Sequence, residues 1–316
     1  MEQCKAETKG PSKPARLTGR ITLQINDMKL LTIDVEEWFH VLGKGSCGTE
    51  KDWDNYPKRL EEGAYRILDL LNERGVKCTF FCVGWVANKY PGLIKRMEKE
   101  GHQVGSHTYM HRLATGQTRK EFTADLKRSL SCLSQITGRK VTCFRAPGFS
   151  INTTNLWVLE VLLEQGIEID SSLVGASLHS YSGLRKANFS EPFLINVGGA
   201  SLKEFPVSLT SIFNRKMIFS GGGYFRLFPY RWIREWTRRS EYTMTYFHCH
   251  DFDVNQPPAR DAGLLHRMKR AYGLRRAFRK FERYLDDFPF ANIEHIDRKT
   301  EWARRQQISL EHLATL

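Results

Sequence analysis

Short apolar runs alternate with longer amphipathic segments along most of the chain. The run MKLLTIDVEEW, residues 28–38, is too short for a helix and ends in acidic residues, which predicts a buried strand. In residues 57–74 the apolar positions recur at helical spacing, with Pro57 suited to a first turn and Gly75 to a stop. The order then repeats, with strands expected at 76–84, 102–107, 141–148 and 167–172, and helices at 91–100, 118–136 and 154–166.

This regular alternation predicts an α/β fold with a parallel sheet, either a barrel or a doubly wound sheet. Residues 175–230 are expected to be mainly loops. A helix at 230–239, a strand at 242–253 and a basic amphipathic helix at 266–283 should follow. We expect a loose N-terminal tail at 1–27, one domain at 28–295 and a helical extension at 296–316.

The chain carries 48 Lys and Arg against 35 Asp and Glu, a formal net charge of +13, which favours anionic partners. Within 266–283, Met268, Tyr272, Leu274 and Phe278 are spaced among basic residues as in an amphipathic helix. Its charged face is either simply solvated or a docking surface for an anionic membrane or glycan. No nucleic-acid reading motif accompanies the charge, so nucleic acid is not an expected partner.

The seven cysteines form an odd, scattered set, which fits reduced thiols. No apolar stretch approaches the ~18 residues of a membrane span, and the first twenty residues are polar and basic. These features predict a cytoplasmic protein, either free or held at the inner face of the membrane.

Polar residues follow several of the expected strands. In parallel α/β folds the carboxyl ends of the strands build the active site. His107 and His111 are four positions apart, a spacing that lets two imidazoles bind one metal ion. The full set is Asp34 and Glu36 after the first strand, His107 and His111 after the third, Arg145 and Pro147 after the fourth, Asp170 after the fifth and His248 near the last.

Eight segments, in this order and spacing, resemble the polysaccharide deacetylases of carbohydrate esterase family four. They are TIDVEEW, TFFCVGW, GHQVGSHTYMH, FRAPGFSI, DSS, EFPVS, GGGYFRLFPY and YFHCHDFD. The resemblance covers roughly residues 28–295 and is greatest to a bacterial subgroup associated with exopolysaccharide gene clusters. It implies a distorted (β/α) barrel with a divalent metal, usually zinc, held by one carboxylate and two histidines.

The resemblance implies that His107 and His111 are metal ligands. Asp34 is expected to be the general base and Glu36 the third ligand, because alternate strand residues point the same way. The two roles could be exchanged, and Glu37 is a weaker candidate. His248 stands where the family places its general acid, although His250 could take that role.

The remaining expectations concern groups around these residues. Arg145 should orient Asp34 through a bidentate hydrogen bond, and the Gly148 N–H is a candidate oxyanion donor. Asp170 is expected either to pair with the His248 imidazolium or to cap a turn. Candidates for stacking on sugar rings, or else core residues, are Trp38, Phe149 and Tyr224. His40 and His102 are expected to be loop and strand-edge residues.

Taken with the resemblance, these residues predict a metal-dependent hydrolase that removes N-acetyl groups from an amino-sugar glycan or its precursor and releases acetate. Two alternatives stay open. One is a cyclic amide or imide hydrolase on the same barrel. The other is a non-catalytic protein that binds an anionic glycan or membrane surface.

Overall fold

The computed structural model describes residues 28–40, 49–176, 183–184, 187–212, 215–257 and 271–316. Its centre is a sheet with the strand order β12-β2-β3-β4-β5-β6-β8-β7-β13. All neighbouring pairs run parallel except β7 and β8. The expected α/β fold with a mostly parallel sheet is therefore confirmed. No pairing between β12 and β13 occurs in the described part of the chain, and barrel closure stays a prediction.

The strands of this sheet are β2 (Thr32–Val35), β3 (Thr79–Cys82), β4 (Gln103–Ser106), β5 (Cys143–Phe144), β6 (Ile169–Asp170), β7 (Phe193–Val197), β8 (Ala200–Glu204), β12 (Phe247–His248) and β13 (Gln307–Ser309). Two further pairs are β1 (Met28–Leu30) with β11 (Tyr242–Met244), and β9 (Leu209–Ile212) with β10 (Arg215–Ile218).

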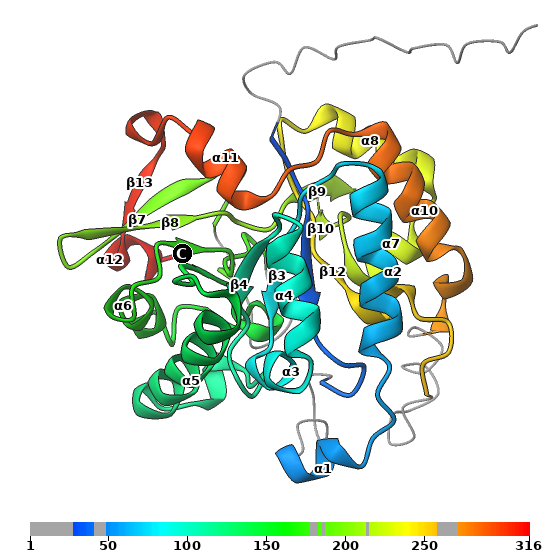
Figure 1. Cartoon of the computed structure of the whole chain (residues 1–316). Helices are drawn as coiled ribbons and strands as arrows, with labels where there is room; N and C mark the ends of the chain where they lie inside the picture. The colour runs from blue at the N-terminus through cyan, green and yellow to red at the C-terminus, as the bar shows by residue number, and fades with distance from the viewer. Residues whose placement is uncertain (1–27, 41–48, 177–182, 185–186, 213–214, 258–270) are drawn as a thin grey trace, which may run out of the picture.

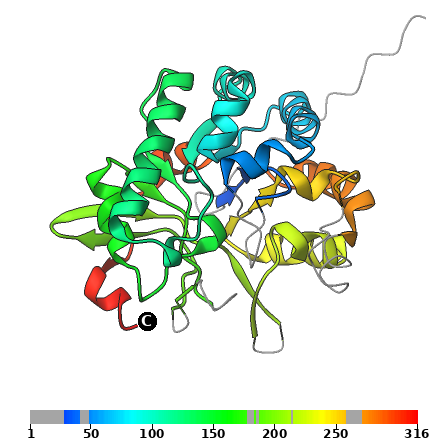
Figure 2. The ribbon, with the colours of Figure 1, turned by 90° about the horizontal axis from the view of Figure 1, so that it is seen from below.

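The helices are α1 (Glu50–Asp54), α2 (Leu60–Glu73), α3 (Gly84–Lys89), α4 (Pro91–Lys99), α5 (Arg119–Thr137), α6 (Trp157–Glu164), α7 (Gly222–Leu227), α8 (Tyr230–Arg239), α10 (Leu274–Asp287), α11 (Ile293–Lys299) and α12 (Leu310–Leu313). Short 3-10 turns are η1 (Ala114–Gly116), η2 (Pro147–Phe149), η3 (Cys249–Phe252) and η4 (Trp302–Arg304). Figures 1 and 2 show α2, α4 and α5 side by side on one face of the sheet.

Helix α5 illustrates how local signals set the elements. Thr118 precedes it, and the Thr118 and Glu121 side chains form a reciprocal capping box. Gly138 ends it with φ 70, a left-handed conformation that glycine adopts without strain. Between these signals Phe122, Leu126 and Leu133 face the core. The observed bounds agree with the predicted helix at 118–136 to within a residue or two.

Four expected segments differ from the structure. The predicted strand 28–38 is two strands, β1 and β2, and the predicted strand 242–253 ends at His248, where η3 begins. Residues 175–230, expected to be mainly loops, contain β7, β8, β9, β10 and α7. The segment 296–316, expected to be a helical extension, includes β13, which pairs with β7 in the central sheet. Short strands of this kind depend on distant partners, which local pattern does not reveal.

The described cysteines are all free thiols. Cys78, Cys82, Cys143 and Cys249 are buried and Cys132 is half-buried, as expected of reduced side chains. No helix in the described ranges has both the length and the apolar character needed to cross a bilayer. The expected cytoplasmic location stays a prediction, and Met268 of the predicted basic helix lies outside the described residues.

Candidate functional site

The carboxyl ends of β2, β4 and β12 bring the predicted polar residues together. In the sheet Asp34 is the register partner of His248, and Ser106, at the end of β4, immediately precedes His107. Asp34, Glu36, His107 and His111 are at most 5% exposed. The strand ends therefore converge on one buried polar cluster, as the parallel order predicts.

Glu36, His107 and His111 form a group able to hold a metal ion. Each offers a ligand atom, and these atoms all lie within 4.8 Å of one another. His111 Nε2 is 2.5 Å from Glu36 Oε2. Two imidazoles and one carboxylate match the donor set of a catalytic zinc site and leave coordination positions for water and substrate.

The orientation of His107 also suits a ligand. Its Nδ1 is 2.7 Å from the Arg145 carbonyl oxygen, so Nδ1 carries the proton and donates it, leaving the Nε2 lone pair for an ion. Burial lowers the pKa of His107 to about 4, against the opposing influence of Asp34, so the ring is neutral at pH 7. Burial by itself would raise the pKa of Glu36, but His111, with His248 and His250, holds it well below its usual range.

Strained backbone surrounds this group. Among the described non-glycine residues, positive φ occurs at Thr108 (61), His111 (50) and Phe149 (53). Such conformations are costly and persist where the surrounding structure enforces them, commonly at functional sites.

Two helices enforce the conformation of the loop 107–111. At the N-terminus of α3, Gly84 N and Trp85 N donate to the carbonyl oxygens of Thr108 and Tyr109, at 2.8 and 3.2 Å. From α5, the Asp125 carboxylate accepts from Tyr109 N and Met110 N, at 2.9 and 3.1 Å. The loop is thereby fixed between α3 and α5 by its own backbone.

Arg145 contacts Asp34 as expected, but through one hydrogen bond. Its Nη1 donates to Asp34 Oδ1 at 2.9 Å and also to Thr32 Oγ1, while Nε and Nη2 donate to Ser171. The expected bidentate pairing is thus not found, because Ser171 takes the other side of the guanidinium. Asp34 Oδ2 faces the Nε2 atoms of His107 and His248, at 3.9 and 3.8 Å.

His248 is paired with Asp251. Its Nδ1 lies 3.0 Å from Asp251 Oδ2, which also accepts from the His248 backbone N–H at 2.9 Å. Burial alone would lower the pKa of His248, but the hydrogen bond and charge of Asp251, with Glu36 and Asp34, raise it to about 9. Arg226 lies on the other side, with Nε 3.3 Å from Asp251 Oδ1. The His248 imidazole is therefore protonated at pH 7 and able to donate a proton from Nε2.

The expected pairing of Asp170 with His248 is wrong. Asp170 lies on β6, separated from β12 by β2, β3, β4 and β5, and it accepts from Ser172 Oγ at 2.5 Å. Asp170 is also hydrogen-bonded to Glu204, and burial raises the pKa of both carboxyls. One proton shared between the two acids satisfies this buried pair. Sequence reasoning missed Asp251 and Glu204, although Asp251 is three residues from His248 and Glu204 is two residues before Pro206.

The oxyanion and stacking candidates surround the same cluster. Gly148 adopts φ 62 in η2, and its N–H donates to no other described residue. Trp38 and Phe149 are buried, Trp38 Nε1 donates to the Pro57 carbonyl, and Phe149 packs edge-on against Tyr246. These contacts favour core roles for both aromatic rings. Tyr224 is half-buried and stacks on Phe228.

Four other acids and histidines were given minor roles. Glu37 is buried and accepts from Arg59 N and Tyr90 Oη, so it is satisfied away from the metal group and is not solvated. His40 is buried, not exposed on a loop, and its ring stacks on His111 at 5.7 Å. His250 stacks on His248 at 4.8 Å, and its Nδ1 is 3.6 Å from Glu36 Oε1. His102 is buried and accepts from Cys78 N.

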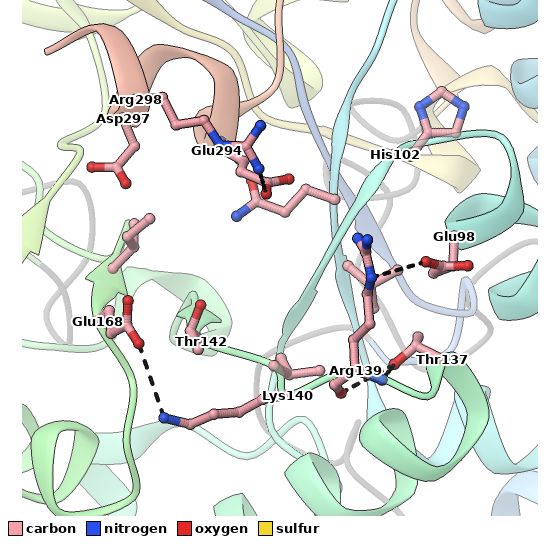
Figure 3. Close-up of a pocket in the computed structure, with 14 residues that line it drawn as sticks. Glu98, His102, Thr137, Arg139, Lys140, Thr142, Glu168, Glu294, Asp297 and Arg298 are labelled. Atoms are coloured by element: carbon pink, nitrogen blue, oxygen red, sulfur yellow. Dashed lines mark hydrogen bonds and ion pairs between the residues drawn. The ribbon is translucent and has the colours of Figure 1, made fainter.

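A pocket of about 220 Å³ lies elsewhere, at the amino ends of β4, β5 and β6 (Figure 3). Its charged residues pair with one another or with neighbours, as in Arg139 with Glu98 and Lys140 with Glu168. None of the Glu36, His107 and His111 group lines it. Because active sites of parallel α/β folds lie at the carboxyl ends, we place the chemistry at the buried cluster.

Two family models match parts of the chain. Residues 52–166 match the family model described as polysaccharide deacetylase, a range that contains His107, His111 and Arg145 and begins after Asp34 and Glu36. Residues 171–298 match a domain of unknown function, DUF3473.

Three curated relatives each match part of the chain. A peptidoglycan-N-acetylglucosamine deacetylase of Bacillus cereus is 33% identical over 30% of this chain and 35% of its own length. A chitin deacetylase of Pestalotiopsis is 38% identical over 29% of this chain and 32% of its own. A peptidoglycan deacetylase of Helicobacter pylori is 31% identical over 41% and 44%. The similarity thus spans less than half the length of each relative.

Solved structures extend the similarity of fold to most of the chain. A crystal structure described as a putative polysaccharide deacetylase from Mycobacterium smegmatis covers 88% of this chain and 91% of its own, with 20% identity and a TM-score of 0.59. An allantoinase covers 85% and 88%, with 15% identity and a TM-score of 0.53. Residues 52–166 thus resemble polysaccharide deacetylases in sequence, and most of the chain shares the fold of a solved structure described as one of them.

Proposed function

We propose that the protein is a metal-dependent N-deacetylase that hydrolyses the acetamide of an N-acetylated amino-sugar glycan or glycan precursor and releases acetate. The observation that carries the proposal is the buried Glu36, His107 and His111 group beside the Asp34 and His248 side chains. The peptidoglycan and chitin deacetylases that match the chain support the substrate class. We further propose Zn²⁺ as the metal and exopolysaccharide biosynthesis as the context, the latter on the sequence resemblance alone.

The donor set fits a divalent cation. When bound there, such a cation supplies Lewis acidity, which polarises a carbonyl and lowers the pKa of water. Glu36, His107 and His111 would hold it, since their ligand atoms already converge and the lone pair of His107 Nε2 is available. Asp34 lies beside this group, because its Oδ2 is close to both His107 and His248. A hydrogen bond from Arg145 holds Asp34 in place.

Asp34 is then the general base. Its Oδ1 accepts from Arg145, which leaves Oδ2 to take the proton of the attacking water. The Gly148 N–H donates to the developing oxyanion, and the His248 imidazolium gives its Nε2 proton to the departing amine. Asp251 keeps His248 oriented and charged for that step, and Arg226 pairs with the other oxygen of Asp251.

Acetate release tests the proposal. Purified protein loaded with Zn²⁺, Co²⁺ or Mn²⁺ should release acetate from at least one member of a panel of N-acetylated oligosaccharides and precursors. Asp34→Asn should retain metal and lose turnover by roughly 100-fold or more, the usual contribution of a general base. Hydrolysis of cyclic amides or imides without acetate release would instead favour the alternative hydrolase. A purified protein that binds anions but holds no stoichiometric metal would favour the non-catalytic alternative.

A further inference from the structure

Three large apolar side chains are exposed close to one another at the end of α7. They are Leu227, Trp232 and Tyr272, which are 52%, 45% and 57% exposed. Burying such side chains is favourable, so a cluster of them on a surface indicates an interaction site. We call these three residues the α7 corner.

The contacts around the corner bring its members together. Trp232 packs on Phe228, with ring centroids 6.5 Å apart, and Phe228 directly follows Leu227. Gly273, next to Tyr272, lies against Arg226, since a Cβ atom there would be 2.9 Å from the Arg226 carbonyl oxygen. Lys280 of α10 donates to the Phe225 and Phe228 carbonyl oxygens, both at 2.7 Å. These contacts fix the end of α7 to the start of α8 and to α10.

Arginines that pair with no carboxylate of the described residues lie on α8 and α10, the two helices that contact the end of α7. Arg275, Arg276 and Arg279 of α10 and Arg231 of α8 are exposed, and none forms an ion pair with a carboxylate of the described residues. Other arginines of α8 are paired, because Arg234 is 3.0 Å from Asp287 and Arg238 is 2.9 Å from Glu235. The charge of the first four is therefore available to an external anion.

The buried side of α10 explains why its arginines face outward. Leu274, Ala277, Phe278 and Phe281 pack into the core, which leaves the intervening positions to solvent. Figure 1 shows α8 and α10 on one side of the molecule, away from α5 and α6. The exposed arginines of α8 and α10 thus lie on helices at the side that also carries the α7 corner.

We propose that this surface docks on an anionic lipid bilayer. Arginines are attracted to acidic headgroups, and Trp, Tyr and Leu side chains enter the interface between headgroups and acyl chains. A soluble polyanion would use the cations and leave Leu227 and Trp232 exposed, so the combination favours a membrane. The corner also adjoins the catalytic cluster, because Leu227 follows Arg226, which contacts Asp251. The docking itself does not rest on the proposed deacetylase function.

Vesicle co-sedimentation of the full chain tests this proposal. The probes are vesicles of phosphatidylcholine alone and of phosphatidylcholine with phosphatidylglycerol, at low and high salt. The wild type should bind the anionic vesicles at low salt and bind the neutral ones weakly. The variant Arg275→Glu, Arg276→Glu, Arg279→Glu should bind on the order of 100-fold more weakly, from about 1 kcal/mol per basic residue at the surface.

A second triple variant is the matched control. Lys95, Lys120 and Lys127 are exposed on α4 and α5 and form no ion pair with a described carboxylate, so their change to Glu alters net charge equally. This control should retain at least a tenth of the wild-type vesicle affinity. The double variant Leu227→Ser, Trp232→Ser should lose the part of vesicle binding that the wild type keeps at moderate salt. All variants should keep the wild-type thermal transition.

Three results would overturn the proposal. One is no binding of the wild type to anionic vesicles at low salt. Another is an equal loss of vesicle affinity in both charge-reversal variants, which would show that net charge alone controls binding. The third is binding to heparin or single-stranded nucleic acid that anionic vesicles fail to displace, which would assign the surface to a soluble polyanion.

Discussion

At the scale of single residues, the site depends on how each ionisable group is partnered. His248 is held charged by Asp251, and His107 is held neutral by burial with its Nδ1 bonded to the Arg145 carbonyl. In the mechanism that we propose, the same residue type therefore serves as a proton donor at one position and as a metal ligand at another. Environment decides the role.

Asp251→Asn should move the alkaline limb of the pH profile. The folded-state pKa of His248 is raised to about 9, so the donor form is present below that pH and lost above it. Removal of the Asp251 charge lowers this pKa, and the alkaline limb of kcat/KM for acetate release should move down by roughly 1–2 pH units. As a control, Asp253→Asn, at a residue that pairs with Arg59, should leave the limb in place. An alkaline limb that stays at the wild-type pH in Asp251→Asn would contradict the role of the Asp251 and His248 pair.

The buried Asp170 and Glu204 pair should make the free energy of unfolding fall as pH rises. Because burial raises both folded-state pKa values, the folded protein binds more protons than the unfolded chain above pH ~4, and stability is lost as pH rises through the folded pKa values. Glu204→Gln supplies a permanent donor to Asp170 and keeps the acceptor for Leu173 N, so it should flatten this dependence. Urea unfolding from acid to neutral pH measures the effect.

Glu204→Ala is the contrasting variant. It leaves Leu173 N without its acceptor and removes the carboxyl that shares a proton with Asp170, so it should lower the free energy of unfolding by about 1–3 kcal/mol. Identical pH dependence in the wild type and Glu204→Gln would refute a shared proton.

The sequence predicted many positions of the site and missed some partners. Spacing and placement after strands were enough to find Asp34, Glu36, His107, His111 and His248. The partner of His248 was missed because the turn of η3, which returns Asp251 to its own strand end, replaces an expected strand. Which groups satisfy a buried charge is a question of tertiary packing, and a motif does not contain the answer.

At the scale of elements, the conformation of the loop 107–111 depends on its contacts with α3 and α5. Gly84 at the start of α3 approaches it so closely that a Cβ atom would lie 2.5 Å from Tyr109 Cδ2 and 3.1 Å from Tyr109 Cα. Its own N–H bonds to the Thr108 carbonyl. The strained His111 conformation is consequently held by helix packing.

Gly84→Ala should therefore displace the loop. Overpacking at this contact should lower the free energy of unfolding by about 1–3 kcal/mol and weaken metal binding, measured by urea unfolding and by metal titration. Gly92→Ala, in α4, is the control, because a Cβ atom there meets nothing within 4 Å. Metal affinity unchanged in Gly84→Ala would show that the loop does not depend on this packing.

Strongly periodic elements and the strands between them were predictable, whereas the later strands were not. Helix α5 has its own cap, stop and apolar stripe, so its bounds follow from local signals. Strands β5 and β6 lie within the expected strands 141–148 and 167–172, although each spans only two residues. The hairpin of β7 and β8 was not expected, because its pairing partners include β6 and β13 from distant parts of the chain.

At the scale of the whole molecule, the C-terminal segment completes the sheet. β13 pairs with β7, and Ile308 and Leu313 are 4% and 0% exposed within a cluster that contains Phe193 and Ile195. Local composition around 296–316 suggested only helix, so this edge of the sheet could not be predicted.

Truncation after residue 300 should expose that edge. Loss of two buried apolar side chains costs about 3–6 kcal/mol at the usual value for each, and the free β7 edge favours association. Calorimetry should find a lower Tm, and light scattering should find concentration-dependent aggregation. Replacement of exposed Arg304 by Ala is a control that keeps the strand. A truncated protein with the wild-type Tm would contradict the structural role of β13.

The central claim is that Glu36, His107 and His111 hold one catalytic divalent ion beside Asp34 and His248. The most direct test is metal stoichiometry and acetate release measured on the same samples of wild type, His107→Ala and Asp34→Asn. We expect one ion per chain and activity in the wild type, neither in His107→Ala, and one ion without activity in Asp34→Asn. A His107→Ala protein that remains fully metallated and active would contradict it.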